Sequence, residues 1–167
     1  MLSGKTVLEV DCGTLRGIEY IAQNLGSAKC TALNSDQATV SWLTKYSTSS
    51  NVEYLPLSLM QWSQECQMKG TTYDCILSIN ATHTGEGYPA KLQTLKNLMS
   101  DRGYICLCEI IPNEQIHAFE GLLHHEGLLV SKSENITKNV LQAIKLEARN
   151  FAAEPFSLQS THHETQN

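Results

Sequence analysis

A short loop near the N-terminus has the residue types of a nucleotide-binding loop. Residues 9–17 (EVDCGTLRG) lie between an apolar, strand-like run and a segment with helical periodicity. Gly13 lets the backbone approach a ligand closely, and the helix that follows presents free N–H groups at its first turn. The chemistry predicted here is the binding of a nucleotide-like ligand by backbone groups.

Two other side chains could take part in proton transfer. His83 follows a strand-like run, and its near-neutral pKa suits a base, although a solvated loop histidine fits the same pattern. Glu109 lies near the end of the most continuous apolar run in the chain. It is either a contact to a substrate or a charge that ends a strand. Tyr88, between these two residues, is expected to pack within its loop.

These residues must be positioned by alternating strands and helices. Apolar β-branched runs alternate with segments whose apolar residues recur at i, i+3, i+4 and i+7. The predicted strands are 6–10, 29–33, 52–55, 73–79, 103–111 and 128–133. The predicted helices are 18–25, 36–46, a segment after Pro89 with Leu92, Leu95, Leu98 and Met99 on its inner face, 113–124 and 136–149. The segment 57–69 is ambiguous, with a short helix around 60–66 as one interpretation.

Strands separated by helical patterns of roughly 10–15 residues specify a parallel sheet, because each crossover must return the chain to the same direction. The predicted fold class is therefore α/β: a Rossmann-like, doubly wound, mostly parallel sheet of about six strands with helices on both faces. Ligands bind such sheets outside the carboxyl ends of the strands, at the point where the strand order reverses. The loops after strands one, two, four and five are the places to look for function.

Length and charge narrow the class of protein. The 167 residues are predicted to form one domain over 1–153 and a disordered polar tail over 154–167. A net charge of -5 without a basic run argues against nucleic acid as a partner. No apolar stretch approaches the roughly 20 residues that span a bilayer, and no signal peptide is evident, so a cytoplasmic location without a membrane span is expected.

The six cysteines are scattered and are expected to be free thiols. Cys106 and Cys108 are the one close pair in the sequence, and no second pair stands at zinc-ligand spacing. No metal site is predicted.

The N-terminal loop resembles the first motif of the class I S-adenosylmethionine-dependent methyltransferases, acidic-x-Gly-x-Gly-x-Gly. Glu9 and Gly13 match this motif, whereas Asp11 and Leu15 stand where the first and third glycines belong. The segment 32–37 (ALNSDQ) is similar to the end of the second strand in the branch that methylates small molecules, sterols and lipids. In that branch an acid or an asparagine faces the ribose, and Asn34 occupies the corresponding place here.

Three later segments resemble the same branch. Residues 73–78 (YDCILS), which end at Ser78, resemble its FDxVxS fourth strand. Residues 99–104 (MSDRGY) stand where the family has a Leu-Lys-Pro-Gly-Gly turn, of which Gly103 remains. Residues 134–140 (ENITKNV) are similar to the Asp-Ile-Thr-x-Asn-Val junction between strand six and its helix. The resemblance covers about residues 5–149.

The resemblance implies S-adenosylmethionine as cofactor and identifies the residues that would face it. Ser58 stands at the place of an aspartate that hydrogen-bonds the adenine amino group in the family, and a neutral hydroxyl would accept that bond more weakly. Asp11 adds a Cβ atom where the backbone must approach the ligand, and its carboxylate would repel the cofactor's own carboxylate. The cofactor-binding residues implied are Glu9, Asp11, Gly13, Asn34, Ser58 and Ser78.

Two functions of different class follow. The first is methyl transfer to a small-molecule or lipid-like acceptor, a displacement that needs mainly alignment and sometimes a base, for which His83 and Glu109 are the candidates. The second is a catalytically inactive methyltransferase-like module that binds a protein partner. Asp11, Leu15, Ser58 and the absence of sequence for a lid and a seventh strand favour it, and it would make oligomers expected. A nicotinamide dehydrogenase is disfavoured because the loop lacks the GxGxxG spacing.

Overall fold

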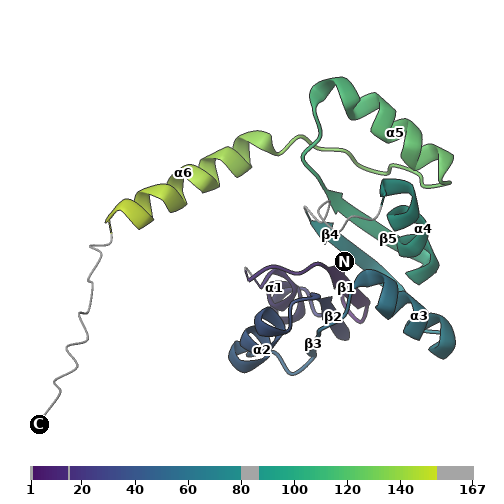
Figure 1. The fold of residues 1–167 in the computed structure, drawn as a ribbon, viewed down its shortest axis with the longest axis horizontal. Helices are drawn as coiled ribbons and strands as arrows, with labels where there is room; N and C mark the ends of the chain where they lie inside the picture. The colour runs from purple at the N-terminus through teal and green to yellow at the C-terminus, as the bar shows by residue number, and fades with distance from the viewer. Residues whose placement is uncertain (1, 15, 80–86, 154–167) are drawn as a thin grey trace, which may run out of the picture. The chain divides into compact units, whose positions relative to one another are not determined.

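Five parallel strands form a sheet with the order β3-β2-β1-β4-β5 (Figure 1). A computed structural model describes residues 2–14, 16–79 and 87–153. The chain runs outward from β1 to β3 and then returns to place β4 on the other side of β1, so the strand order reverses between β1 and β4. The strands are β1 (Thr6–Val10), β2 (Lys29–Leu33), β3 (Val52–Leu55), β4 (Tyr73–Ile79) and β5 (Met99–Cys108).

Helices cover both faces of this sheet. On one face α1 (Gly17–Asn24) and α2 (Gln37–Tyr46) pack on the strands, with Val7, Ile18 and Leu43 in the core. On the other face α3 (Leu59–Lys69) and α4 (Tyr88–Leu98) pack through a second core that includes Leu8 and Leu95. Neighbouring residues of β1, Val7 and Leu8, thus enter opposite cores, as the alternation of side chains along a strand requires.

A further helix, α5 (Ile116–His125), follows a short 3-10 turn (Asn113–Gln115) and packs beside α4. The Tyr88 and Phe119 rings meet edge to face with centroids 5.1 Å apart, and Lys96 Nζ donates to the Glu126 carbonyl. The chain divides into two compact units, Met1–Leu129 and Val130–Asn167. The second unit contains α6 (Thr137–Ala153), an amphipathic helix with Val140, Leu141 and Ile144 exposed.

Local signals in the sequence explain where several helices begin and end. Asp36 caps α2 by accepting hydrogen bonds from the Ala38 and Thr39 N–H groups. Pro89 occupies the first turn of α4, where a missing N–H costs no helical hydrogen bond. Gly70 ends α3 with a φ of 63°, a left-handed conformation that favours glycine.

The α/β fold class is confirmed, and the first five predicted strands are present. The predicted sixth strand, 128–133, is wrong: this segment has no strand structure. A strand needs a hydrogen-bonded neighbour, and in the described part of the chain β5 pairs with β4 alone. The fifth strand also spans 99–108 instead of 103–111, with an irregular register where it enters the sheet opposite Tyr73. The ambiguous segment after β3 forms α3, whereas the predicted tail lies outside the described residues. No described helix is long and apolar enough to cross a membrane.

Gly103 is the residue at which the irregular start of β5 tolerates no side chain. A Cβ atom there would lie 2.5 Å from Met99 Cγ and 3.0 Å from the Tyr73 carbonyl oxygen. We expect Gly103→Ala to lower the free energy of unfolding by about 1–3 kcal/mol, because overpacking forces the backbone to shift. Urea unfolding followed by circular dichroism measures this change.

Gly121→Ala is the matched control, because this glycine lies in α5 with no described atom within 4 Å of the added Cβ position. Alanine is the better helix former by about 1 kcal/mol, so the control variant should be more stable than the parent. Equal changes in the two variants would contradict the assignment of Gly103 to a tight backbone contact.

Candidate functional site

The Glu9 carboxylate lies beneath the loop that follows β1 and fixes the start of α1. Its side chain accepts a hydrogen bond of 3.1 Å from the Ile18 N–H group, and the residue is 7% exposed. Burial raises the pKa of Glu9, and the Ile18 N–H opposes that rise. Glu9 therefore holds the loop in place from below.

The loop above Glu9 has an unusual backbone. Asp11, at the place of the family's first glycine, has a φ of 53°, which L-residues adopt rarely and aspartate more readily than most. The Cys12 N–H group donates to the Leu33 carbonyl at 2.8 Å, which ties the loop to the end of β2. A Cβ atom added at Gly13 would meet no described atom within 4 Å. The backbone at Gly13 is therefore open to a ligand.

Asn34 joins the loops that follow β1 and β2. Its Nδ2 donates to the Cys12 carbonyl at 2.8 Å, and its Oδ1 accepts from the Asp36 N–H at 2.7 Å. An amide nitrogen has two N–H groups and an amide oxygen has two lone pairs, so each atom keeps one further hydrogen bond for a ligand. Asn34 thus supports the loop and keeps part of its hydrogen-bonding capacity.

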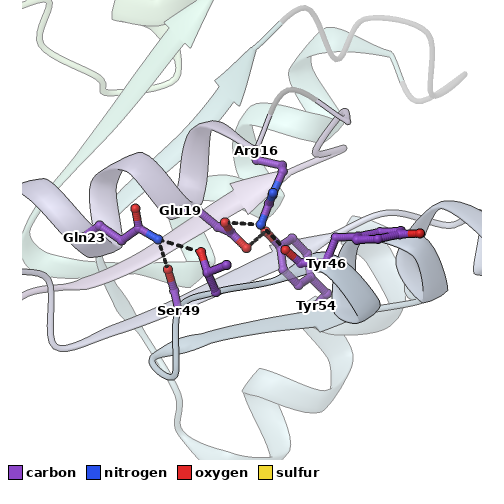
Figure 2. A network of polar contacts seen from close by, with 7 residues as sticks. Arg16, Glu19, Gln23, Tyr46, Ser49 and Tyr54 are labelled. Atoms are coloured by element: carbon purple, nitrogen blue, oxygen red, sulfur yellow. Dashed lines mark hydrogen bonds and ion pairs between the residues drawn. The ribbon is translucent and has the colours of Figure 1, made fainter.

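A polar network fixes the other end of the loop, where α1 begins (Figure 2). Arg16, with a φ of 57°, pairs with Glu19 at 2.5 Å and also donates to the Tyr46 carbonyl at the end of α2. The Tyr54 hydroxyl of β3 donates to Glu19 at 3.3 Å. Burial alone would raise the pKa of Glu19, but its hydrogen bonds to Arg16 and Tyr54 outweigh burial and lower it. The network holds α1, α2 and β3 together at the end of the loop where α1 begins.

The two serines implied as cofactor contacts lie at strand ends on the same edge of the sheet. Ser58 follows β3 and caps α3: its hydroxyl accepts from the Gln61 N–H at 3.3 Å and donates to Gln61 Oε1 at 3.0 Å. Ser78 lies opposite Val10 in β4, is fully buried, and its hydroxyl has no hydrogen-bond partner among the described residues. Because the strands are parallel, the carboxyl ends of β1 to β4 bring the six implied cofactor residues to one edge.

Glu109 follows β5 and forms a buried cluster with two residues of α4. Its Oε1 lies 3.6 Å from Lys91 Nζ, and the two side chains are 2% and 3% exposed. Lys91 Nζ lies 5.7 Å from the centre of the Tyr88 ring. Burial and the neighbouring Glu109 carboxylate raise the pKa of Tyr88. This cluster lies at the carboxyl ends of β4 and β5, on the same edge of the sheet as the residues implied to bind a cofactor.

Sequence reasoning found Glu109 but missed Lys91. A usable signal was present, since Lys91 precedes Leu95 and Leu98 by four and seven residues and therefore shares their buried helix face. Tyr88 begins α4 instead of lying in a loop. His83 lies outside the described residues. No group of three potential metal ligands occurs in the described ranges.

A parallel sheet whose strand order reverses beside a glycine-containing loop defines the nucleotide-binding α/β class. No family model matches the chain. It is 29% identical over 147 residues to the probable phthiotriol/phenolphthiotriol dimycocerosates methyltransferase 2 of Mycobacterium ulcerans (strain Agy99). The match covers 87% of this chain and 55% of that protein, so the chain spans about half the length of the curated relatives it matches.

Solved structures agree on the fold. Coclaurine N-methyltransferase bound to N-methylheliamine and SAH (S-adenosylhomocysteine) superimposes with a TM-score of 0.55 and 22% identity, over 64% of this chain and 31% of that one. The putative methyltransferase SMU.776, complexed with SAH, gives a TM-score of 0.62 and 16% identity, over 78% and 37%. The chain has the fold of the class I S-adenosylmethionine-dependent methyltransferases and resembles them in sequence.

The raised pKa of Glu9 makes a prediction about stability and pH. Because the native carboxyl binds its proton more tightly than the unfolded one, its contribution is largest below the usual value of 4.5 and is lost as the pH rises through the native pKa. We expect the stability of the parent relative to Glu9→Gln to fall as the pH rises above 4.5 and through the raised native pKa. Urea unfolding at several pH values measures this difference.

Asp36→Asn gives a control of opposite sign. Hydrogen bonds from Thr39 and Ala38 lower the pKa of Asp36 below 3.8, so its contribution is present above that value and lost as the pH falls. The parent should therefore gain stability over this variant as the pH rises through the lowered native pKa toward 3.8. A parent-minus-variant difference for Glu9 that does not change with pH would contradict its burial as a titrating carboxyl.

Proposed function

We propose that the chain transfers a methyl group from S-adenosylmethionine to a small-molecule or lipid-like acceptor. The observation that carries this proposal is the open backbone at Gly13, held from below by Glu9 at the reversal of the strand order. A ligand there can approach the Gly13 backbone closely, because an added Cβ atom would meet no described atom within 4 Å. Similarity over most of the chain to a protein named as a methyltransferase supports the same function.

The residues at this edge suit the parts of the cofactor. The Gly13 backbone would face its amino-acid end, the Asn34 amide its ribose hydroxyls, and the Ser58 hydroxyl its adenine. The buried Ser78 hydroxyl supplies one further polar group below the loop. Asp11 is the residue that opposes binding, because a carboxylate close to the cofactor's carboxylate is repulsive. The cofactor supplies a methyl group activated by an adjacent sulfonium.

The acceptor would lie over the carboxyl ends of β4 and β5. The relative from Mycobacterium ulcerans is named for lipid substrates, phthiotriol and phenolphthiotriol dimycocerosates, which supports a lipid-like acceptor for this chain. We assign Glu109 to the acceptor side, where its carboxylate receives a proton from the acceptor. His83, which lies outside the described residues, remains a second candidate base.

The free edge of β5 supports association with a protein partner or a second copy of the chain. In the described part of the molecule β5 has one neighbouring strand, and its Tyr104 side chain is 65% exposed. Unpaired strand edges pair readily with other chains. Nucleic acid is not among the proposed partners, because the net charge is -5.

Calorimetric titration with S-adenosylmethionine and S-adenosylhomocysteine tests the proposal. We expect the parent chain to bind both with a Kd in the micromolar range, about -8 kcal/mol. Asp11→Gly should bind about tenfold more tightly, because it removes a repulsive charge and the Cβ atom from the place where the backbone must approach the ligand. Asp11→Asn keeps the side-chain size and tolerates the same φ, so it isolates the contribution of charge.

Asp101→Asn, an exposed change at the start of β5, serves as the control and should bind as the parent does. If neither the parent nor Asp11→Gly binds either ligand, the proposed function fails. If Asp11→Gly binds and the parent does not, the fold has kept the site but this chain is not an active methyltransferase.

A further inference from the structure

Two cysteines of neighbouring strands, Cys75 of β4 and Cys106 of β5, share one face of the sheet. Cys75 belongs to the core on the side of α1 and α2, whereas Ile105 of β5 packs against the core on the opposite side. Because side chains alternate along a strand, Cys106 projects to the same face as Cys75. The register places Cys75 opposite Tyr104, so Cys106 is the next residue of β5 on that face.

Cys106 is the one cysteine of this chain that solvent reaches freely. Its side chain is exposed, and that of Cys108 is half-buried. The four buried cysteines are Cys12, Cys30, Cys66 and Cys75. Burial raises the pKa of the first three, which keeps these thiols protonated, and a protonated thiol is not a nucleophile. A thiol reagent in solution therefore meets Cys106 first.

The Cys75 thiol donates a hydrogen bond to the Cys106 sulfur. This bond favours the thiolate of Cys106 and lowers its pKa, although desolvation opposes the shift. The same bond raises the pKa of Cys75, and burial and the neighbouring Asp74 and Cys30 add to that rise. The pair therefore keeps its proton on the buried sulfur and leaves the exposed sulfur as the nucleophile.

The surroundings of Cys106 make Cys75 the group that controls it. Among the described residues, Cys75 is the one whose interaction lowers the pKa of Cys106. In the regular part of β5, the other titratable side chains on this face are Tyr104 and Cys108. Helix α4, which contains Lys91, packs on the opposite face of β5. A change at Cys75 therefore tests the activation of Cys106 directly.

The strand register disfavours an internal disulfide between Cys75 and Cys106. Residues diagonal to each other across a strand pair have Cα atoms roughly 7–8 Å apart, and a disulfide spans at most about 7 Å without backbone movement. The raised pKa of Cys75 also makes it a weak nucleophile at neutral pH. A group that becomes attached to Cys106 is therefore not displaced by Cys75.

We propose that Cys106 is a modification site for a low-molecular-mass disulfide, and that Cys75 is its positioning residue. The Cys106 thiolate attacks one sulfur of the reagent, a new sulfur–sulfur bond forms, and the original sulfur–sulfur bond breaks. One half of the reagent leaves as a thiolate, which takes a proton from water, and the other half stays on Cys106 as a mixed disulfide. Cys106 is oxidised and the departing half is reduced, so no further oxidant is needed. This inference goes beyond the proposed function and does not depend on it.

Reaction of the reduced full chain with glutathione disulfide tests the site. Intact-mass spectrometry follows the rate, and peptide mapping locates the modified cysteine. We expect a mixed disulfide on Cys106 before any other cysteine reacts, and Cys106→Ser should slow this first reaction about tenfold or more. Cys108→Ser is the matched control, because Cys108 lies on the same face of the same strand, and its rate should stay within about twofold of the parent.

The pH dependence of the rate tests the role of Cys75. Cys75→Ala removes the hydrogen-bond donor, so a smaller fraction of Cys106 is thiolate at neutral pH. At about pH 7 the parent should react about threefold or more faster than this variant. At about pH 10 the order should reverse, because Cys106 is then a thiolate in both proteins and a thiolate of lower pKa is the weaker nucleophile. Cys75→Ser keeps a donor and should restore the behaviour of the parent.

Each outcome decides one part of the proposal. Rate profiles of the parent and Cys75→Ala that cross, with the parent profile restored in Cys75→Ser, support it. Parallel profiles overturn the role of Cys75, because a packing defect alone would not move the pH dependence. A first reaction on Cys108, or the formation of a Cys75–Cys106 disulfide, overturns the site. If Cys75→Ala does not fold, judged by circular dichroism, Cys75→Val fills the core and tests the same point.

Discussion

The hydrogen bond from the Ile18 N–H group to the Glu9 carboxylate is the interaction on which the rest of the site depends. It fixes the first turn of α1 to the end of β1, so the intervening loop has both ends set by the same rigid strand. The Cys12 N–H group donates a hydrogen bond to the Leu33 carbonyl and so connects the loop to the end of β2. Between these two attachments the backbone at Gly13 stays open, since an added Cβ atom would meet no described atom within 4 Å.

Unfavourable features are concentrated around this loop. Asp11 and Arg16 both have a positive φ, and Glu9 and Glu19 are carboxyl groups removed from water. Strained backbone and buried charge persist only where the surroundings fix them, and they occur most often at functional sites. Here β1, β2, β4 and the Arg16–Glu19 network fix the loop. This supports a ligand-binding role for the loop, although it departs from the glycine pattern of the methyltransferases that it resembles.

The sequence predicted those parts of the fold that depend on local pattern. Continuous β-branched runs gave five of the strands, and the spacing of Leu92, Leu95 and Leu98 gave α4. The segment 128–133 has the same local pattern, yet it forms no strand because pairing depends on a neighbour that pattern alone does not provide. Asn34 supports a loop and Ser58 caps a helix. The sequence pattern did not predict these roles, because each depends on which groups the fold places beside the side chain. Lys91 was missed because a charged residue was not expected on a buried helix face.

The residues at the carboxyl ends of β1 to β3 differ in chemical character from those at the end of β5. Over β1 to β3 the strand ends carry polar groups that are largely committed to holding loops, whereas the end of β5 adjoins an apolar groove with one buried ion pair. Methyl displacement from a sulfonium needs alignment of two reactants more than it needs a strong base. Under the proposed function, the specific interactions of the chain are therefore expected in the elements that position the two reactants. The Glu9–Ile18 bond, the Arg16 network and the Lys91–Glu109 pair all fit that expectation, since each fixes the position of a loop, a helix or a ring.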